Sequence, residues 1–256
     1  MLPELGVLRI GTLVRHNTIL LLREPGPVLS RLLMPLVAVL VFQPLYRAAM
    51  AAQGRTAGTE QAVTGVLMLF SLLAISIAGT AILAERSWHT WDRLRSTPVR
   101  PVELLVGKAL PVFAVLLLQQ VVVLGFGVLV LGLPVPSVGL LAVAVGCWSL
   151  ALLCIGTALG TVLRSQAEFS AAQDIGGFLF ASLGGALVPL AGMPGWARDI
   201  APASPAYWGM SALRGALSDQ PSVLLRAAAV LLGIAVLAAT VAALRIRRGW
   251  GRSRLI

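Results

Sequence analysis

The chain alternates between long apolar runs and short polar interruptions, and this alternation predicts how often it crosses a membrane. A helix needs about 20 apolar residues to span a hydrocarbon core of about 30 Å. Six segments meet or approach this length, so we expect an all-α membrane protein, a single transmembrane domain over residues 1–256 with six transmembrane helices. The predicted spans are residues 28–46, 61–84, 109–131, 138–163, 175–191 and 223–244.

Glycine and proline divide the apolar runs further. Residues 109–163 are uncharged and too long for one passage, and Gly132-Leu-Pro-Val-Pro-Ser137 interrupts them, which predicts a helical hairpin. Residues 192–221 are rich in Gly, Pro and aromatics yet weakly polar, which favours re-entrant or interfacial structure. Gly156-Thr-Ala-Leu-Gly160 is a small-xxx-small motif, for which packing within the chain is favoured over dimerisation.

The first 26 residues predict an amphipathic helix that lies in the membrane interface rather than crossing it. One face is apolar, the opposite face carries basic residues, and the helix should end before Pro25-Gly26-Pro27. Asn17 interrupts the apolar face. The apolar positions are Val7, Ile10, Val14 and Leu21, and those on the opposite face are Arg9, Thr12, His16 and Arg23.

A polar segment, residues 85–98, separates the second predicted span from the third. Trp88, Trp91 and Leu94-Arg95 recur at intervals of three or four residues, which predicts a short helix with an aromatic edge that Pro98 ends. By itself this pattern also fits an interfacial anchor, with tryptophans at headgroup level and arginines on lipid phosphate. The pattern leaves a lipid anchor and a partner contact both open.

Composition and charge place the chain in a membrane. It is 58% apolar and 12% charged, whereas soluble domains are roughly 45–50% apolar and about 25% charged. Six spans put both termini on one side, and fifteen basic residues fall on that side against five on the other. We therefore expect a multi-pass protein of the cytoplasmic (inner) membrane with cytoplasmic N- and C-termini. This bias accounts for the net charge of +10 without nucleic acid as a partner.

The sequence offers little for catalysis by this chain alone. Its one Gly-Lys pair, Gly107-Lys108, precedes Ala109 and lacks the leading glycine of a phosphate-binding loop. The uncharged runs hold no acid or base, which disfavours an intramembrane hydrolase or a proton-driven pump. The histidines lack partners at metal spacing, and Cys147 and Cys154 are too far apart on one helix for a disulfide. We expect no enzyme, no metal site and no bound cofactor.

Three stretches resemble ABC exporter permeases of the type-2 class, in the branch of drug- and antibiotic-resistance permeases. The most specific is Glu85-Arg86…Thr90-Trp91-Asp92-Arg93-Leu94-Arg95-Ser96-Thr97-Pro98, followed by Leu104-Leu-Val-Gly-Lys108. Leu20-Leu-Leu-Arg23-Glu24-Pro25 resembles the connecting helix of that class, and residues 192–215 resemble its external re-entrant segment. The resemblance covers essentially the whole chain. Trp88 and Trp91 depart from it, since many relatives carry Gly and Leu there.

The resemblance implies a permease subunit driven by separate ATPase subunits. Residues 85–98 would be a coupling helix seated in a groove of the ATPase, and residues 1–26 a connecting helix beside it. Two ATPase subunits would bind ATP and Mg, and a second permease, identical or paralogous, would complete the assembly. The implied coupling residues are Glu85, Arg86, Thr90, Trp91, Leu94, Arg95 and Pro98, with Arg15, Arg23 and Glu24 on the connecting helix.

The resemblance also implies that the second and fifth spans line a cavity between the two permeases. Such a mostly apolar cavity favours export of a hydrophobic or amphipathic substrate, a drug, antibiotic or lipid. Export of a lipid-linked polysaccharide is an alternative, and a membrane-embedded interaction or sensor protein without transport is another. The candidate pathway residues, for which lipid-facing or packing roles stay open, are Phe70, Ser71, Ser76, Thr80, Phe178, Phe180 and Ser182.

Overall fold

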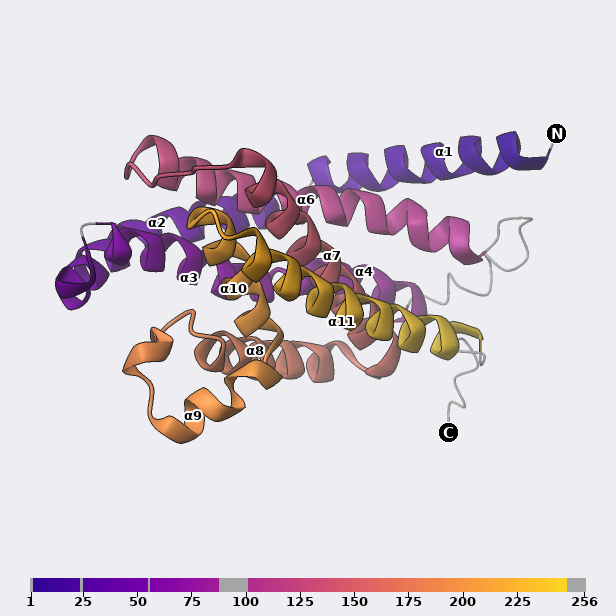
Figure 1. The fold of residues 1–256 in the computed structure, drawn as a ribbon. Helices are drawn as coiled ribbons and strands as arrows, with labels where there is room; N and C mark the ends of the chain where they lie inside the picture. Colours follow the sequence, from indigo (N-terminus) through magenta and orange to yellow (C-terminus); the bar gives the residue numbers. More distant parts are fainter. Residues whose placement is uncertain (1, 24, 55, 88–100, 248–256) are drawn as a thin grey trace.

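The computed structural model describes residues 2–23, 25–54, 56–87 and 101–247, and this part of the chain is helical without strands (Figure 1). Single 3₁₀ turns occupy Ala51–Gln53, Leu190–Gly192 and Ala201–Ala203. The α-helices are α1 (Leu2–Arg23), α2 (Pro25–Ala49), α3 (Ala57–Leu73), α4 (Ile75–Ser87), α6 (Pro101–Leu129), α7 (Val138–Val162), α8 (Gln166–Leu183), α9 (Gly195–Ile200), α10 (Pro205–Leu217) and α11 (Pro221–Arg247).

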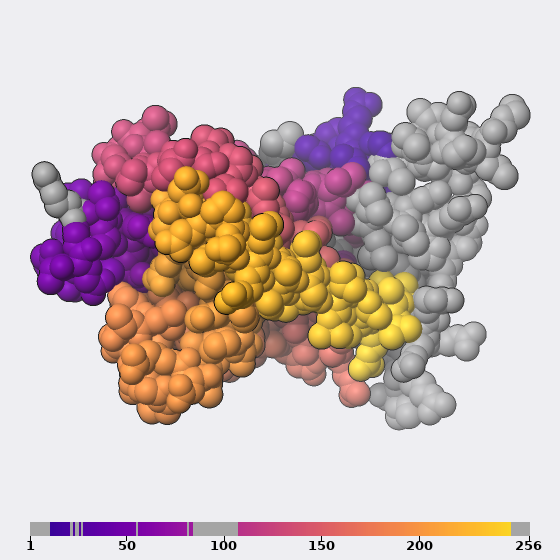
Figure 2. Space-filling view, in the orientation of Figure 1, coloured from indigo at the N-terminus to yellow at the C-terminus, as the bar shows by residue number. Residues whose placement is uncertain are grey.

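The long helices form an elongated bundle with two distinct ends. At one end lie the start of α1, the end of α4, the start of α6 and the end of α11 (Figure 1). We call this the N/C end. At the opposite end lie the connections from α2 to α3 and from α6 to α7, together with α9. In the space-filling view α11, in yellow, crosses the visible face between the two ends (Figure 2).

Five segments of the described chain are long and apolar enough to cross a membrane. They overlap five of the six predicted spans, and they extend the third and sixth toward the N/C end, to Gly107 and Ile246. These candidate spans are Val28–Ala49, Ala57–Thr80, Gly107–Leu129, Val138–Val162 and Pro221–Ile246.

The predicted fifth span, residues 175–191, differs from the observed helix. It begins in the middle of α8 and runs eight residues past the end of that helix at Leu183. The Ser165 side chain caps α8 by accepting a hydrogen bond of 3.1 Å from the Glu168 amide. Gly185, with φ +85°, takes a left-handed conformation just after the helix, where glycine is favoured. Because the first half of α8 is polar, this 18-residue helix is not among the five candidate spans.

The core is built around α7, which packs along α11 and α4. Trp148 of α7 is fully buried, and its indole N–H donates to Ser71 Oγ at 2.8 Å. On the same helix, a Cβ at Gly160 would lie 2.7 Å from the Gly79 carbonyl oxygen of α4, and one at Gly156 2.8 Å from the Ala78 Cβ. The small-xxx-small motif therefore packs two helices of one chain, as predicted.

The segment after α8 is more helical than predicted and is held at the opposite end. Gln61 Nε2 donates to the carbonyls of Gly185 and Ala186 at 2.9 and 3.0 Å, and Ser204 Oγ donates to the Phe180 carbonyl at 2.8 Å. After the short α9, α10 returns into the bundle, where Met210 is 1% exposed. These side-chain bonds tie α3 and the N-cap of α10 to backbone carbonyls at the end of α8 and just after it.

Candidate functional site

The predicted coupling segment begins at the end of α4. Glu85 and Arg86 lie in the last turn of that helix, and α6 begins at Pro101. The remaining predicted coupling residues fall outside the residues that the structure describes: Thr90, Trp91, Leu94, Arg95 and Pro98. The structure describes the two helix ends that this segment joins, the end of α4 and the start of α6, and both lie at the N/C end of the bundle (Figure 1).

The predicted connecting helix, α1, packs against the first half of α6. Asn17, which interrupts the apolar face in the sequence, donates through Nδ2 to the carbonyls of Leu13 at 2.9 Å and Gly107 at 3.3 Å. A Cβ at Gly107 would lie 2.6 Å from the Leu13 Cβ, so a glycine is needed where the helices touch. Asn17 therefore anchors α1. Arg15 and Arg23 are exposed, and Glu24 lies outside the described residues.

The second span is broken at Ala74, between α3 and α4. The Ile77 amide donates to the Ala74 carbonyl at 3.1 Å instead of continuing the ladder to Leu73. The freed Leu73 carbonyl accepts from Gln173 Nε2 of α8 at 2.8 Å and from Ser76 Oγ at 3.1 Å. Side chains thus replace the lost helix bond at the break, as a bilayer interior requires.

Arg31 of α2 reaches the same break. Its Nη2 donates to Ser76 Oγ at 2.7 Å, so the side chain points toward α4. Within the bundle, the Ser76 hydroxyl thus offers an acceptor to the Arg31 guanidinium. Thr80, one turn further along α4, donates to the Ser76 carbonyl at 2.6 Å. A guanidinium, two hydroxyls and an amide from three segments converge at the break in the second span.

The other hydroxyls of the predicted pathway also bond to their surroundings. Ser71 is 1% exposed and joins the Trp148 indole to the Met68 carbonyl, which its hydroxyl reaches at 3.0 Å. Ser182 donates to the Phe178 carbonyl one turn earlier, at 2.7 Å. Hydroxyls that donate to carbonyls of their own helix present little polarity to a cavity. The polar members of the predicted pathway therefore leave it largely apolar.

The aromatic members separate into packed and open positions. Phe70 is half-buried and packs on the core, whereas Phe178 and Phe180 of α8 are 59% and 38% exposed. Phe178 shares an open apolar face with Ile175 and Leu179. Since α8 packs against α3 and α4, the structure brings the second and fifth predicted spans together, with this face beside them.

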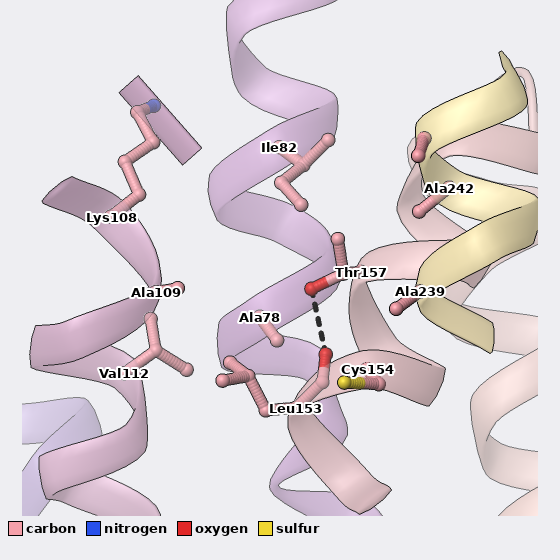
Figure 3. A pocket seen from close by; sticks show the side chains of 11 residues that line it. Ala78, Ile82, Lys108, Ala109, Val112, Leu153, Cys154, Thr157, Ala239 and Ala242 are labelled. Carbon is pink, nitrogen blue, oxygen red and sulfur yellow. Dashed lines mark hydrogen bonds between the residues drawn. The ribbon is translucent and has the colours of Figure 1, made fainter. Parts of the chain in front are cut away.

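An apolar cavity of about 200 Å³ lies between α4, α6, α7 and α11 (Figure 3). Small side chains line it, among them Ala78, Ala109 and Ala242, and Lys108 stands at one edge (Figure 3). Thr157 bonds to the Leu153 carbonyl at 2.7 Å, so its hydroxyl is engaged within α7. Drug-sized sites usually measure roughly 300–1,000 Å³. This cavity is smaller, and none of the predicted pathway residues lines it.

Several buried polar residues were not predicted from the sequence. Gln119 and Gln120 of α6 are buried, and their Oε1 atoms have no hydrogen-bond partner within the described residues. Gln120 Nε2 bonds to Ser149 of α7. Arg214 Nη2 donates to Gln61 Oε1 at 2.6 Å near the opposite end. A glutamine in an apolar run was the available signal, but only the fold shows which ones meet a partner.

Comparison with known families agrees with this architecture. Residues 9–218 match the family model of the ABC-2 type transporter. No curated protein matches the chain. The match begins in α1, includes the broken second span and the segment around α9, and ends just after α10. With five apolar helices of spanning length and a match over most of its length, this multi-pass membrane chain belongs to the ABC-2 type transporter family as a permease.

Proposed function

We propose that the chain is the permease subunit of an ATP-driven exporter in the cytoplasmic membrane. Membership of the ABC-2 family implies association with ABC ATPase partners. Two such partners would bind ATP and Mg, since the chain carries no phosphate-binding loop of its own. A second permease, identical or paralogous, would complete the translocation unit. The threefold excess of basic residues on the side that six predicted spans assign to the termini supports a cytoplasmic position for both termini.

The proposed cargo is a hydrophobic or amphipathic molecule, such as a drug, an antibiotic or a lipid. The open apolar face formed by Ile175, Phe178 and Leu179 carries this proposal. It lies beside the second span, whose hydroxyls at Ser71 and Thr80 bond within the bundle. An apolar surface next to the break at Ala74 offers van der Waals contacts to a hydrophobic cargo and few hydrogen bonds to a sugar.

Energy would enter through residues 85–98 at the N/C end. Closure of the ATPase pair would displace this segment and, with it, the end of α4 and the start of α6. Going along α4 from that end, the chain reaches the break at Ala74. The helix α8, which carries the open face, packs against α3 and α4 on either side of this break. Because the helix is interrupted at Ala74, α4 could then move while α3 keeps its position in the bundle.

Purification with the ATPase tests the proposal. The partner ABC ATPase should co-purify with the wild-type permease and be lost with Leu94→Asp or Arg95→Glu. The reconstituted pair should hydrolyse ATP faster when a hydrophobic cargo is added, and Phe178→Ala should reduce that stimulation. Stimulation by a lipid-linked polysaccharide alone would favour the polysaccharide permease. Absence of any bound ATPase would contradict transport and favour a sensor.

A further inference from the structure

A polar cavity of about 230 Å³ lies at the end of the bundle opposite the termini. The connection from α2 to α3, the first turn of α3, residues 189–191 and Arg214 of α10 form its walls. Two opposite charges face it, the Glu60 carboxylate and the Arg214 guanidinium. No other cavity described above brings an acid and a base together. Its volume is below the roughly 300–1,000 Å³ of drug-sized sites, which favours a ligand of head-group size.

The guanidinium of Arg214 is held in place from behind. Its Nη2 donates to Gln61 Oε1 at 2.6 Å, and Gln61 Nε2 bonds to the Gly185 and Ala186 carbonyls at 2.9 and 3.0 Å. An arginine has five N–H donors, and this is the one side-chain bond that Arg214 makes within the described residues. The remaining donors are available to an anion.

Glu60 faces the same space without a direct partner. Among the residues that the structure describes, none forms a hydrogen bond or an ion pair with its carboxylate. Burial lowers the pKa of the Arg214 guanidinium, and the negative charge of Glu60 opposes that shift. The two charges therefore influence one another across the cavity without touching. The space between Glu60 and Arg214 can therefore hold a group that carries both a positive and a negative charge.

The position of the cavity indicates where that group comes from. The candidate spans of α2 and α3 end at Ala49 and begin at Ala57, so the cavity lies at the level where a bilayer presents its head groups. In the orientation proposed above, this is the outer leaflet. Polar groups at this depth meet phospholipid at high local concentration. A lipid head group is thus the dipolar molecule that encounters the site most often.

We propose that this cavity binds the head group of a phospholipid with a primary ammonium, phosphatidylethanolamine, through Glu60 and Arg214. The ammonium would donate hydrogen bonds to the Glu60 carboxylate, and the phosphate would accept them from the free N–H groups of Arg214. Gln61 is the positioning residue, because it holds the guanidinium against the 185–186 backbone. Choline lipids carry the same charges but no ammonium donors, and glycerol lipids carry no cation.

Lipid binding to the purified full-length permease tests this site without the ATPase, so its result does not depend on the exporter proposal. Phosphatidylethanolamine, phosphatidylcholine and phosphatidylglycerol would be titrated separately and resolved by native mass spectrometry. The wild type should bind phosphatidylethanolamine about 10-fold more tightly than the other two, the effect of one charge-assisted hydrogen bond. Glu60→Gln should remove this preference: it takes away the carboxylate that accepts from the ammonium, and it removes a negative charge that disfavours phosphatidylglycerol beside Arg214, so phosphatidylglycerol should bind at least as tightly as to the wild type.

Matched variants separate the site from general charge effects. Asp199→Asn makes the same charge change on the exposed α9 and should keep the preference. Arg214→Lys, which retains the charge but not the fork, should weaken both phosphatidylethanolamine and phosphatidylglycerol. If a variant fails to fold, the comparison of the three lipids on the wild type still decides. Equal affinity for the ethanolamine and choline lipids, or a preference that survives in Glu60→Gln, would overturn the proposal.

Discussion

The side-chain amide of Gln173 donates a 2.8 Å hydrogen bond to the carbonyl of Leu73, where the second span breaks. This bond links α8 to α3 at the one point where α3 and α4 lose helical continuity. A carbonyl freed inside a bilayer costs several kcal/mol if unpaired. Gln173 and Ser76 supply the replacement donors. The break is therefore stabilised by the assembled bundle, through a residue a hundred positions away in the sequence.

Gln173→Leu should destabilise the permease, because it removes one of the two donors at the Leu73 carbonyl. The expected loss is about 1–2 kcal/mol in the free energy of unfolding. Thermal unfolding of the purified protein measures it. Gln166→Leu, an exposed position at the start of the same helix, is the control and should change little. Equal melting temperatures for both variants would show that Gln173 does not stabilise the break at Ala74.

Gly160→Ala and Gly146→Ala make the same change in α7 and should have opposite effects. A methyl at Gly160 would lie 2.7 Å from the Gly79 carbonyl oxygen, whereas one at Gly146 meets nothing within 4 Å. We expect Gly160→Ala to lower the unfolding free energy by about 1–3 kcal/mol through overpacking. Gly146→Ala should raise it by up to about 1 kcal/mol, because alanine restricts the unfolded chain. Unfolding in mixed micelles measures both, and similar values would contradict the close approach.

Phe178→Ala and Phe169→Ala separate a role at the open face from a role in the core. Phe169 is 1% exposed, and truncating it should cost about 3 kcal/mol of stability. Phe178 is 59% exposed, so its truncation should change stability by less than about 0.5 kcal/mol. Transport of a hydrophobic cargo in vesicles, normalised to ATP hydrolysis, should fall with Phe178→Ala. Unchanged transport of that cargo would remove Phe178 from the pathway.

Gln61→Leu should loosen the segment that follows α8, because it removes the donors to Gly185 and Ala186 and the acceptor of Arg214. Backbone amides of residues 184–204 should exchange with deuterium about 10-fold faster or more, as expected from a loss of about 1.4 kcal/mol or more. Peptides from α7 should keep their protection. Gln53→Leu, at an exposed position near the same end, is the control. No change in residues 184–204 would contradict the anchoring role.

The apolar pattern predicted the helical class, the hairpin of α6 and α7, and the approximate bounds of five spans. These features follow from local composition, since a long uncharged run forms a helix in a bilayer whatever surrounds it. The helix α8 begins before the predicted fifth span, because its polar first turns, around Glu168 and Asp174, were assigned to a loop. In the structure that polar part is the capped start of α8.

The sequence could not predict which polar side chains form hydrogen bonds with one another. The break at Ala74 has neither glycine nor proline beside it, and it depends on Gln173 and Ser76 meeting one carbonyl. Arg31 gave no sign that it would meet Ser76. Gln61 and Arg214 are 153 positions apart. Pairings at such separations are set by the fold, so the residues could be seen but their partners could not.

The contact of Gly160 with Gly79 makes α4 and α7 a single mechanical part. Backbone lies directly on backbone there, with no flexible side chains between that could absorb a displacement. Because α7 also packs along α11, three helices share this stiffness. A displacement of the end of α4 at the N/C end would therefore move α7 and α11 with it. Changes of shape would then occur in α8 and at the break at Ala74.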